Sequence, residues 1–92
     1  MHQALAHQPG DDVAVAVTAI EPGDSVVVAY LDSDHVETVT ARGAVPYGHK
    51  IAVHDRAEGD EVIEYGTRVG IATVVIMSGD YVHTQNLKSA RW

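Results

Sequence analysis

Two short stretches of this sequence carry side chains that could perform acid–base chemistry. The first is Gly48-His49-Lys50, at the junction between a loop and a Val/Ile/Ala-rich run. An imidazole can exchange a proton near neutral pH or bind a metal, and a preceding glycine lets the backbone turn sharply. His49 and Lys50 would then project from the mouth of a strand and be candidate catalytic residues. The alternative is a surface-loop histidine followed by a solvated charge.

The second stretch is Val82-His83-Thr84-Gln85-Asn86. If this stretch is extended, alternation places His83 and Gln85 on one face and Val82 and Thr84 on the other. His83 is then a second candidate catalytic residue. The alternative is a histidine at a strand end, held by the backbone.

The remaining histidines carry weaker signals. His35 lies in an acidic turn and His54 precedes Asp55-Arg56, so we expect both at the surface; His2 and His7 lie in the first residues of the chain. The sequence contains no nucleophile elbow, phosphate loop or dinucleotide fingerprint, and no cysteine. Thiolate nucleophiles, disulfides and iron–sulfur ligation are therefore excluded for this chain. Elimination, metal-assisted chemistry or binding remain.

Short strands separated by glycine turns must position these residues. Strands are predicted over residues 13–17, 25–30, 36–41, 50–54, 61–64 and 69–77, and no segment shows a convincing helical stripe. A Gly-Asp-x-Val pattern recurs three times, beginning at Gly23, Gly59 and Gly79. In each, the glycine can adopt positive φ and the aspartate can bond to nearby amides. The sequence therefore predicts an all-β fold.

Length and charge narrow the class of protein further. A chain of 92 residues is one domain, with too little volume to enclose a deep site alone. We predict a flexible segment over residues 1–10, the domain over 11–87 and a tail over 88–92. The net charge of −7 disfavours nucleic acid and anionic membranes, and is consistent with a high-salt cytoplasm. No leader or membrane-spanning run is evident, so a cytoplasmic location is expected.

The order of the motifs is more specific than any one of them. It runs through Pro46-Tyr47-Gly48-His49-Lys50, Val62-Ile63-Glu64-Tyr65-Gly66, Val69-Gly70-Ile71-Ala72 and Gly79-Asp80-Tyr81-Val82-His83. In this order the chain resembles the SAF-type domain that begins altronate and galactarate dehydratases and that forms the small subunit of sulfolactate sulfo-lyase. The resemblance implies a compact β-clip domain; a small open barrel is the alternative.

The resemblance also implies a function. It predicts the small subunit of a metal-dependent lyase acting on a hydroxy acid, either an altronate-type sugar acid or sulfolactate, with a separate large dehydratase subunit. Iron or manganese is expected mainly on that large subunit, with His49 or His83 as a candidate ligand here. Catalytic roles fall on His49, Lys50 and His83, and substrate binding on Gly48, Gln85 and Asn86. The family carries a second histidine where this chain has Gln85, so a metal site built wholly on this segment is not expected.

The competing hypothesis is a non-catalytic binding or assembly module with the same fold, because fold alone does not settle function. A lyase subunit should bring His49 and His83 together at a cleft, whereas a binding module need not. On either hypothesis the isolated chain should be inactive. The terminal Arg91-Trp92 is a candidate partner anchor, with a frayed tail as the alternative.

Overall fold

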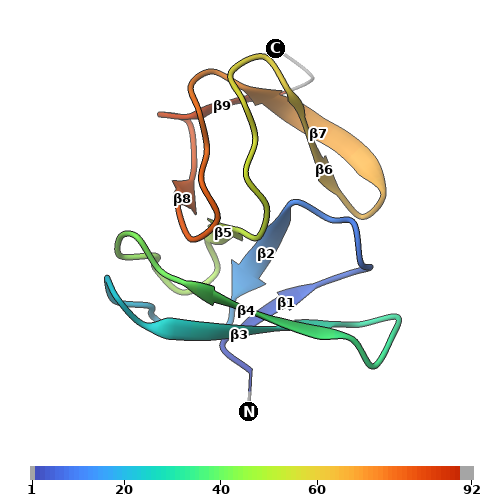
Figure 1. Cartoon of the computed structure of the whole chain (residues 1–92), viewed down its shortest axis with the longest axis vertical. Helices are drawn as coiled ribbons and strands as arrows, with labels where there is room; N and C mark the ends of the chain where they lie inside the picture. Colours follow the sequence, from blue (N-terminus) through green and yellow to red (C-terminus); the bar gives the residue numbers. More distant parts are fainter. Residues whose placement is uncertain (1, 90–92) are drawn as a thin grey trace.

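The computed structural model describes residues 2–89, which form strands and turns without a helix. None of these residues therefore belongs to a helix that could cross a membrane. The strands are β1 (Ala4–Ala6), β2 (Val13–Ala16), β3 (Ser25–Tyr30), β4 (Val36–Thr40), β5 (Lys50–Ala52), β6 (Glu61–Glu64), β7 (Thr67–Ala72), β8 (Tyr81–Val82) and β9 (Leu87–Ser89). They make a six-stranded sheet in the order β4-β3-β1-β2-β5-β8 and a three-stranded sheet in the order β6-β7-β9 (Figure 1). The all-β prediction is confirmed.

The strands predicted over residues 25–30 and 36–41 are present as β3 and β4, which form a hairpin paired antiparallel from Ser25 opposite Thr40 to Ala29 opposite Val36. The burial of side chains along β3 alternates with the two-residue period of a strand: Val26 and Val28 are fully buried, and the residues beside them are half-exposed or exposed. These valines join a core cluster with Ile51 of β5 and other small apolar residues. Val and Ala suit this core because thin side chains let short strands pack closely.

Ala4–Ala6 form strand β1, which lies within the segment over residues 1–10 that we predicted to be flexible. Strand β1 lies between β2 and β3, antiparallel to β2 and parallel to β3. Ala4 is completely buried, and the ring of His7 lies 4.8 Å from that of Tyr65. The apolar run that forms β1 is too short to show a periodicity in the sequence. Pairing with a neighbouring strand along each of its edges nevertheless holds it in the sheet. The predicted tail also begins inside β9, while Arg91-Trp92 lies outside the described residues.

Two adjacent carboxylates tie the two sheets together. Asp11 is fully buried and Asp12 is 2% exposed. Asp11 accepts hydrogen bonds from the backbone amides of His7, Gln8, Tyr65 and Gly66. Asp12 accepts from the Ile63 amide and the Arg56 side chain, and lies 3.2 Å from the His54 imidazole Nδ1. His54, predicted as an exposed corner residue, is thus partly buried in a charge network, because buried carboxylates require such partners.

Four segments of equal length recur within residues 2–89 and end in similar turns. They cover residues 16–24, 41–49, 52–60 and 72–80, and each runs from a buried alanine to a turn glycine and the residue after it. The segments pair two by two: Ile20 bridges Val45, and Arg56 bridges Ile76. The predicted strand over 69–77 accordingly stops at Ala72, because the rest of that run follows this loop pairing instead of a ladder. Val74 and Val75 are consequently exposed.

The turns share one backbone geometry. The glycine at the third position has φ of 82° to 95° in all four, as expected for type II turns, and these glycines are Gly23, Gly48, Gly59 and Gly79. In three turns the following aspartate accepts a hydrogen bond from the amide three residues earlier, at 2.8–2.9 Å; these aspartates are Asp24, Asp60 and Asp80. This confirms the turn chemistry predicted from the Gly-Asp-x-Val pattern. The fourth turn, Pro46-Tyr47-Gly48-His49, differs from the others.

Candidate functional site

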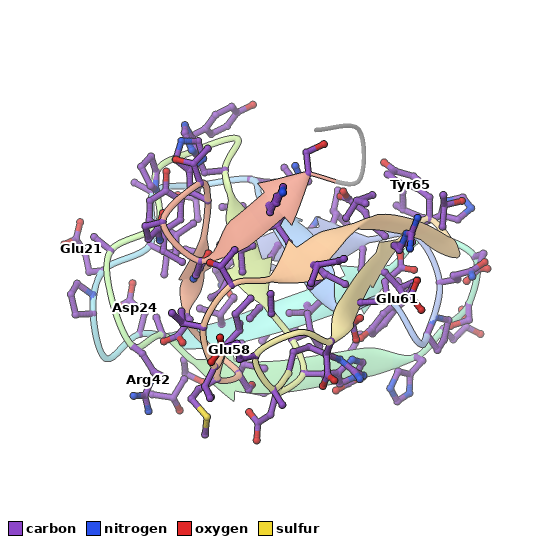
Figure 2. All side chains as sticks on the ribbon, turned by 90° about the horizontal axis from the view of Figure 1, so that it is seen from above. Glu21, Asp24, Arg42, Glu58, Glu61 and Tyr65 are labelled. Atoms are coloured by element: carbon purple, nitrogen blue, oxygen red, sulfur yellow. The ribbon has the colours of Figure 1, made fainter. Side chains whose placement is uncertain are left out.

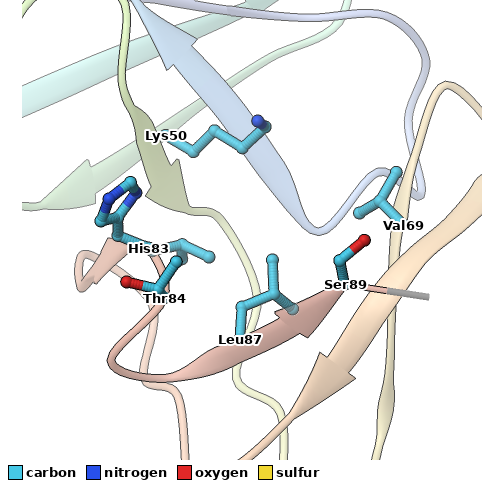
Figure 3. A pocket seen from close by; sticks show the side chains of 7 residues that line it. Lys50, Val69, His83, Thr84, Leu87 and Ser89 are labelled. Atoms are coloured by element: carbon cyan, nitrogen blue, oxygen red, sulfur yellow. The ribbon is translucent and has the colours of Figure 1, made fainter. Parts of the chain in front are cut away.

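A cavity of about 250 Å³ lies between the two sheets. Its lining residues come from β5, β7, β8, β9 and the turn after β8, and they are Lys50, Val69, Val82, His83, Thr84, Leu87 and Ser89. Figure 3 shows His83 at one end, Val69 and Ser89 at the other, and the Lys50 side chain extending along the cavity. A cation, an imidazole and a hydroxyl beside an apolar wall suit a small anionic ligand carrying hydroxyl groups. The site depends on strands distant in sequence.

His49 and His83 lie together at the His83 end of this cavity. Their ring centroids are 5.7 Å apart. Tyr81 joins them: its hydroxyl lies 2.8 Å from the His49 Nδ1, and its ring stacks on His83 with centroids 5.6 Å apart and an interplanar angle of 5°. His49 is half-buried and His83 is exposed. The structure therefore forms a cluster of two imidazoles and a phenol, which we call the His49–Tyr81–His83 cluster.

In the turn that contains His49, the imidazole takes no part in the hydrogen bonding that forms the turn. In the other three turns the fourth residue is an aspartate whose carboxylate accepts from the backbone amide of the first residue. In this turn the first residue is Pro46, which has no amide hydrogen, and the fourth residue is His49. Both the donor and the acceptor of the capping bond are thus absent. The backbone bond from the His49 amide to the Pro46 carbonyl, at 3.0 Å, keeps the turn while the imidazole turns to Tyr81.

Lys50 supplies the positive charge of the cavity. Its ammonium lies 3.9 Å from the Glu64 carboxylate, at the far limit of an ion pair. Burial raises the pKa of the Glu64 carboxyl, although the Lys50 ammonium works in the opposite direction. Glu64 is 12% exposed in its side chain and Lys50 is 40% exposed. The ammonium therefore stays accessible to an anionic ligand while Glu64 offsets part of its charge.

The segment after β8 is a turn, which corrects the predicted alternation of His83 and Gln85 on one face. The amides of Asn86 and Leu87 both donate to the His83 carbonyl. Asn86 is 7% exposed, and its side chain accepts from the His83 amide and donates to the Tyr81 carbonyl at 2.8 Å. Gln85 also donates to that carbonyl, at 3.1 Å. Asparagine and aspartate side chains compete effectively for backbone groups, so a polar run here favours a turn over a strand.

The structure thus separates the predicted site residues into two groups. His83 and Lys50 line the cavity, and His49 contacts His83 at its end. Gly48 forms the turn, with its amide bonded to the Ala16 carbonyl, and Asn86 holds the turn beneath His83. We therefore assign Gly48 and Asn86 structural roles.

Sequence reasoning missed Tyr81 and Glu64. Tyr81 stands inside a Gly-Asp-x-Val pattern, where it appeared only as the variable residue before a buried valine. For His49, which was already a candidate, the sequence holds a further signal. In the four segments of equal length, the first alanine precedes the turn glycine by the same interval (16 and 23, 41 and 48, 52 and 59, 72 and 79). The residue after the glycine is aspartate in three segments and His49 in the fourth, so His49 occupies an aspartate position.

The described residues do not form a metal centre by themselves. Among residues 2–89, no group of three or more His, Cys, Asp or Glu side chains is arranged to hold a metal ion. His49 and His83 could offer two nitrogens, fewer than the three protein ligands typical of catalytic metal sites. An iron or manganese ion held here would therefore need further ligands from outside the described residues.

Comparison with known proteins identifies the family. The model of the altronate/galactarate dehydratase SAF domain matches residues 2–90. The chain is 34% identical to (2R)-sulfolactate sulfo-lyase subunit alpha of Chromohalobacter salexigens over 89 residues, which cover 96% of this chain and 95% of that protein. It is 40% identical to altronate dehydratase of Escherichia coli over 79 residues, which cover 86% of this chain but only 15% of that enzyme. The chain belongs to the altronate/galactarate dehydratase SAF domain family.

Proposed function

We propose that this chain is the small subunit of a two-component lyase that acts on a small hydroxy acid. The observation that carries the proposal is that Lys50 and His83 line one cavity and that His49 lies beside His83, although residues 49–50 and 83 are far apart in the sequence. One relative of nearly the same length is named as subunit alpha of a sulfolactate sulfo-lyase. A second relative is an altronate dehydratase, in which the matching region makes up 15% of the enzyme. Altronate-type sugar acids and sulfolactate are accordingly the candidate substrates.

The residues have separable roles in this proposal. The Lys50 ammonium binds the substrate carboxylate or sulfonate, because it is the cation of the cavity and remains accessible. His83 hydrogen-bonds the substrate hydroxyls from the cavity wall, together with the Thr84 hydroxyl. His49 acts on the oxygen at which negative charge develops during elimination.

The large dehydratase subunit completes the site. The chain's cavity is open to the surface and contains neither a full acid–base pair around an enclosed substrate nor a metal centre within its described residues. Iron or manganese is proposed to reside mainly on that subunit. The cytoplasmic location predicted from the sequence is part of the same proposal.

The test is reconstitution. The tagged chain is expressed in its native host, and the co-purifying large subunit is identified by mass spectrometry and then produced separately. Sulfite release from sulfolactate and 2-keto acid formation from altronate are measured for each chain alone and for the mixture. We expect turnover only in the mixture, and turnover by the isolated small chain would overturn the proposal.

Variants assign the roles within the mixture. His49→Ala should lower kcat by roughly 100-fold, the scale of losing an acid–base group, whereas Lys50→Met should act mainly on KM. His35→Ala is the matched control, because His35 is 51% exposed and contacts Tyr30 and Glu37, which do not line the cavity. Full activity of His49→Ala would show that the chain is an assembly module, the alternative function.

A further inference from the structure

We propose that Tyr81 is a positioning residue that holds His49 with its proton on Nε2, so that neutral His49 acts as a hydrogen-bond donor to the substrate. This inference rests on the proposed function for its catalytic meaning. Its structural basis is independent, because it concerns the state of one imidazole in this chain.

The hydroxyl of Tyr81 is held rigidly. Tyr81 lies in β8 opposite Ile51 of β5, and its ring packs against the core cluster. Its carbonyl accepts hydrogen bonds from the side-chain amides of Gln85 and Asn86. The position of the hydroxyl is therefore set by the sheet on one side and by the turn after β8 on the other.

The direction of the hydrogen bond follows from the chemistry of the two groups. The Tyr81 oxygen and the His49 Nδ1 are 2.8 Å apart, a distance typical of a good hydrogen bond. A phenol O–H is a more acidic donor than a neutral imidazole N–H, and an imidazole nitrogen is a more basic acceptor than a phenol oxygen. The hydroxyl therefore donates to Nδ1, and the single proton of the neutral ring lies on Nε2.

The other ring nitrogen is available to a ligand. No hydrogen bond among the described residues uses Nε2 of His49, and the ring is only half-buried. Since His49 is released from turn capping by Pro46, its orientation depends on Tyr81 instead of on the turn. A fixed N–H donor is the kind of group that stabilises negative charge developing on a substrate oxygen.

The test is histidine ¹⁵N NMR of the full chain at a pH where the imidazoles are neutral. We expect His49 to show the pattern of a single tautomer with a protonated Nε2. Tyr81→Phe keeps the ring stacked on His83 but removes the hydroxyl, so His49 should then show averaging between tautomers. Tyr65→Phe is the matched control, because Tyr65 contacts His7 through its ring and should leave the His49 signals unchanged. A protonated Nδ1 in the wild type, or no change in Tyr81→Phe, would overturn the inference.

Kinetics of the reconstituted enzyme then connect the tautomer to activity. Tyr81→Phe should lower kcat by roughly 10- to 100-fold, the range for groups that orient metal-bound histidines, with little change in KM. An unchanged kcat would overturn the positioning role. If His49→Ala retains activity, the proposed function fails, yet the NMR experiment still decides the tautomer. If His49→Ala loses activity but the tautomer is insensitive to Tyr81, only the positioning role fails.

Discussion

The turn that carries His49 should respond to mutation differently from the three aspartate turns. In Asp60→Ala, the amide of Ala57 loses a side-chain acceptor at 2.9 Å. Losing such a capping bond costs about 1 kcal/mol, which in a domain of this size lowers the melting temperature by roughly 4–8 °C. His49→Ala removes the contacts of a half-exposed ring with Tyr81 and His83, so the free energy of unfolding should fall by about 0.5 kcal/mol or less.

Thermal unfolding by circular dichroism, with urea titrations as a second measure, distinguishes these values. The double variant Pro46→Ala/His49→Asp restores both donor and acceptor of the missing capping bond. It should be more stable than His49→Ala by about 1 kcal/mol, and it should be inactive after reconstitution. If His49→Ala proves as destabilising as Asp60→Ala, His49 stabilises its turn as the aspartates do and is a structural turn residue.

Burial raises the pKa of Glu64, so its contribution to stability is present below the ordinary glutamate pKa and is lost as pH rises through the folded-state pKa. Glu64→Gln should therefore flatten the decline in stability as the pH rises above the ordinary glutamate pKa in urea titrations, and an unchanged slope would contradict this assignment. The same variant frees the Lys50 ammonium and should lower KM in the assembled enzyme. Acidic side chains lie at several places on the molecule, among them Glu21, Asp24, Glu58 and Glu61 (Figure 2). Salt screens the repulsion within a net charge of −7, so the melting temperature should rise from dilute to molar salt. A flat or falling melting temperature would count against a high-salt origin. Gly48→Ala places a side chain at φ of 82° and should cost about 1–2 kcal/mol by thermal unfolding, whereas a neutral effect would show that this turn can change its conformation.

The local features of this protein could be read from its residues. The alternation over residues 36–41 and the turn-rich residues 31–35 predicted the strands that form the β3–β4 hairpin, and Gly-Asp pairs predicted the turns, because positive φ and side-chain capping depend only on neighbouring residues. Local context also made Lys50, His49 and His83 candidates for chemistry, and the family resemblance favoured a functional role over a surface role. Local sequence was sufficient for prediction wherever the deciding interaction joins residues that are only a few positions apart.

Tertiary structure decided the rest because the partners come from distant segments. Strand β1 forms only because β2 and β3 flank it, and the run after Ala72 leaves the sheet because Ile76 bridges Arg56. Asn86, a candidate ligand contact by its sequence, holds a turn in the structure, because its side chain is bonded to the His83 amide and the Tyr81 carbonyl. The Tyr81 hydroxyl reaches His49 across the β5–β8 pairing, a contact that no spacing in the sequence encodes. Residue types therefore determined which chemistry is available, whereas strand pairing determined which groups meet and which nitrogen is left for a ligand.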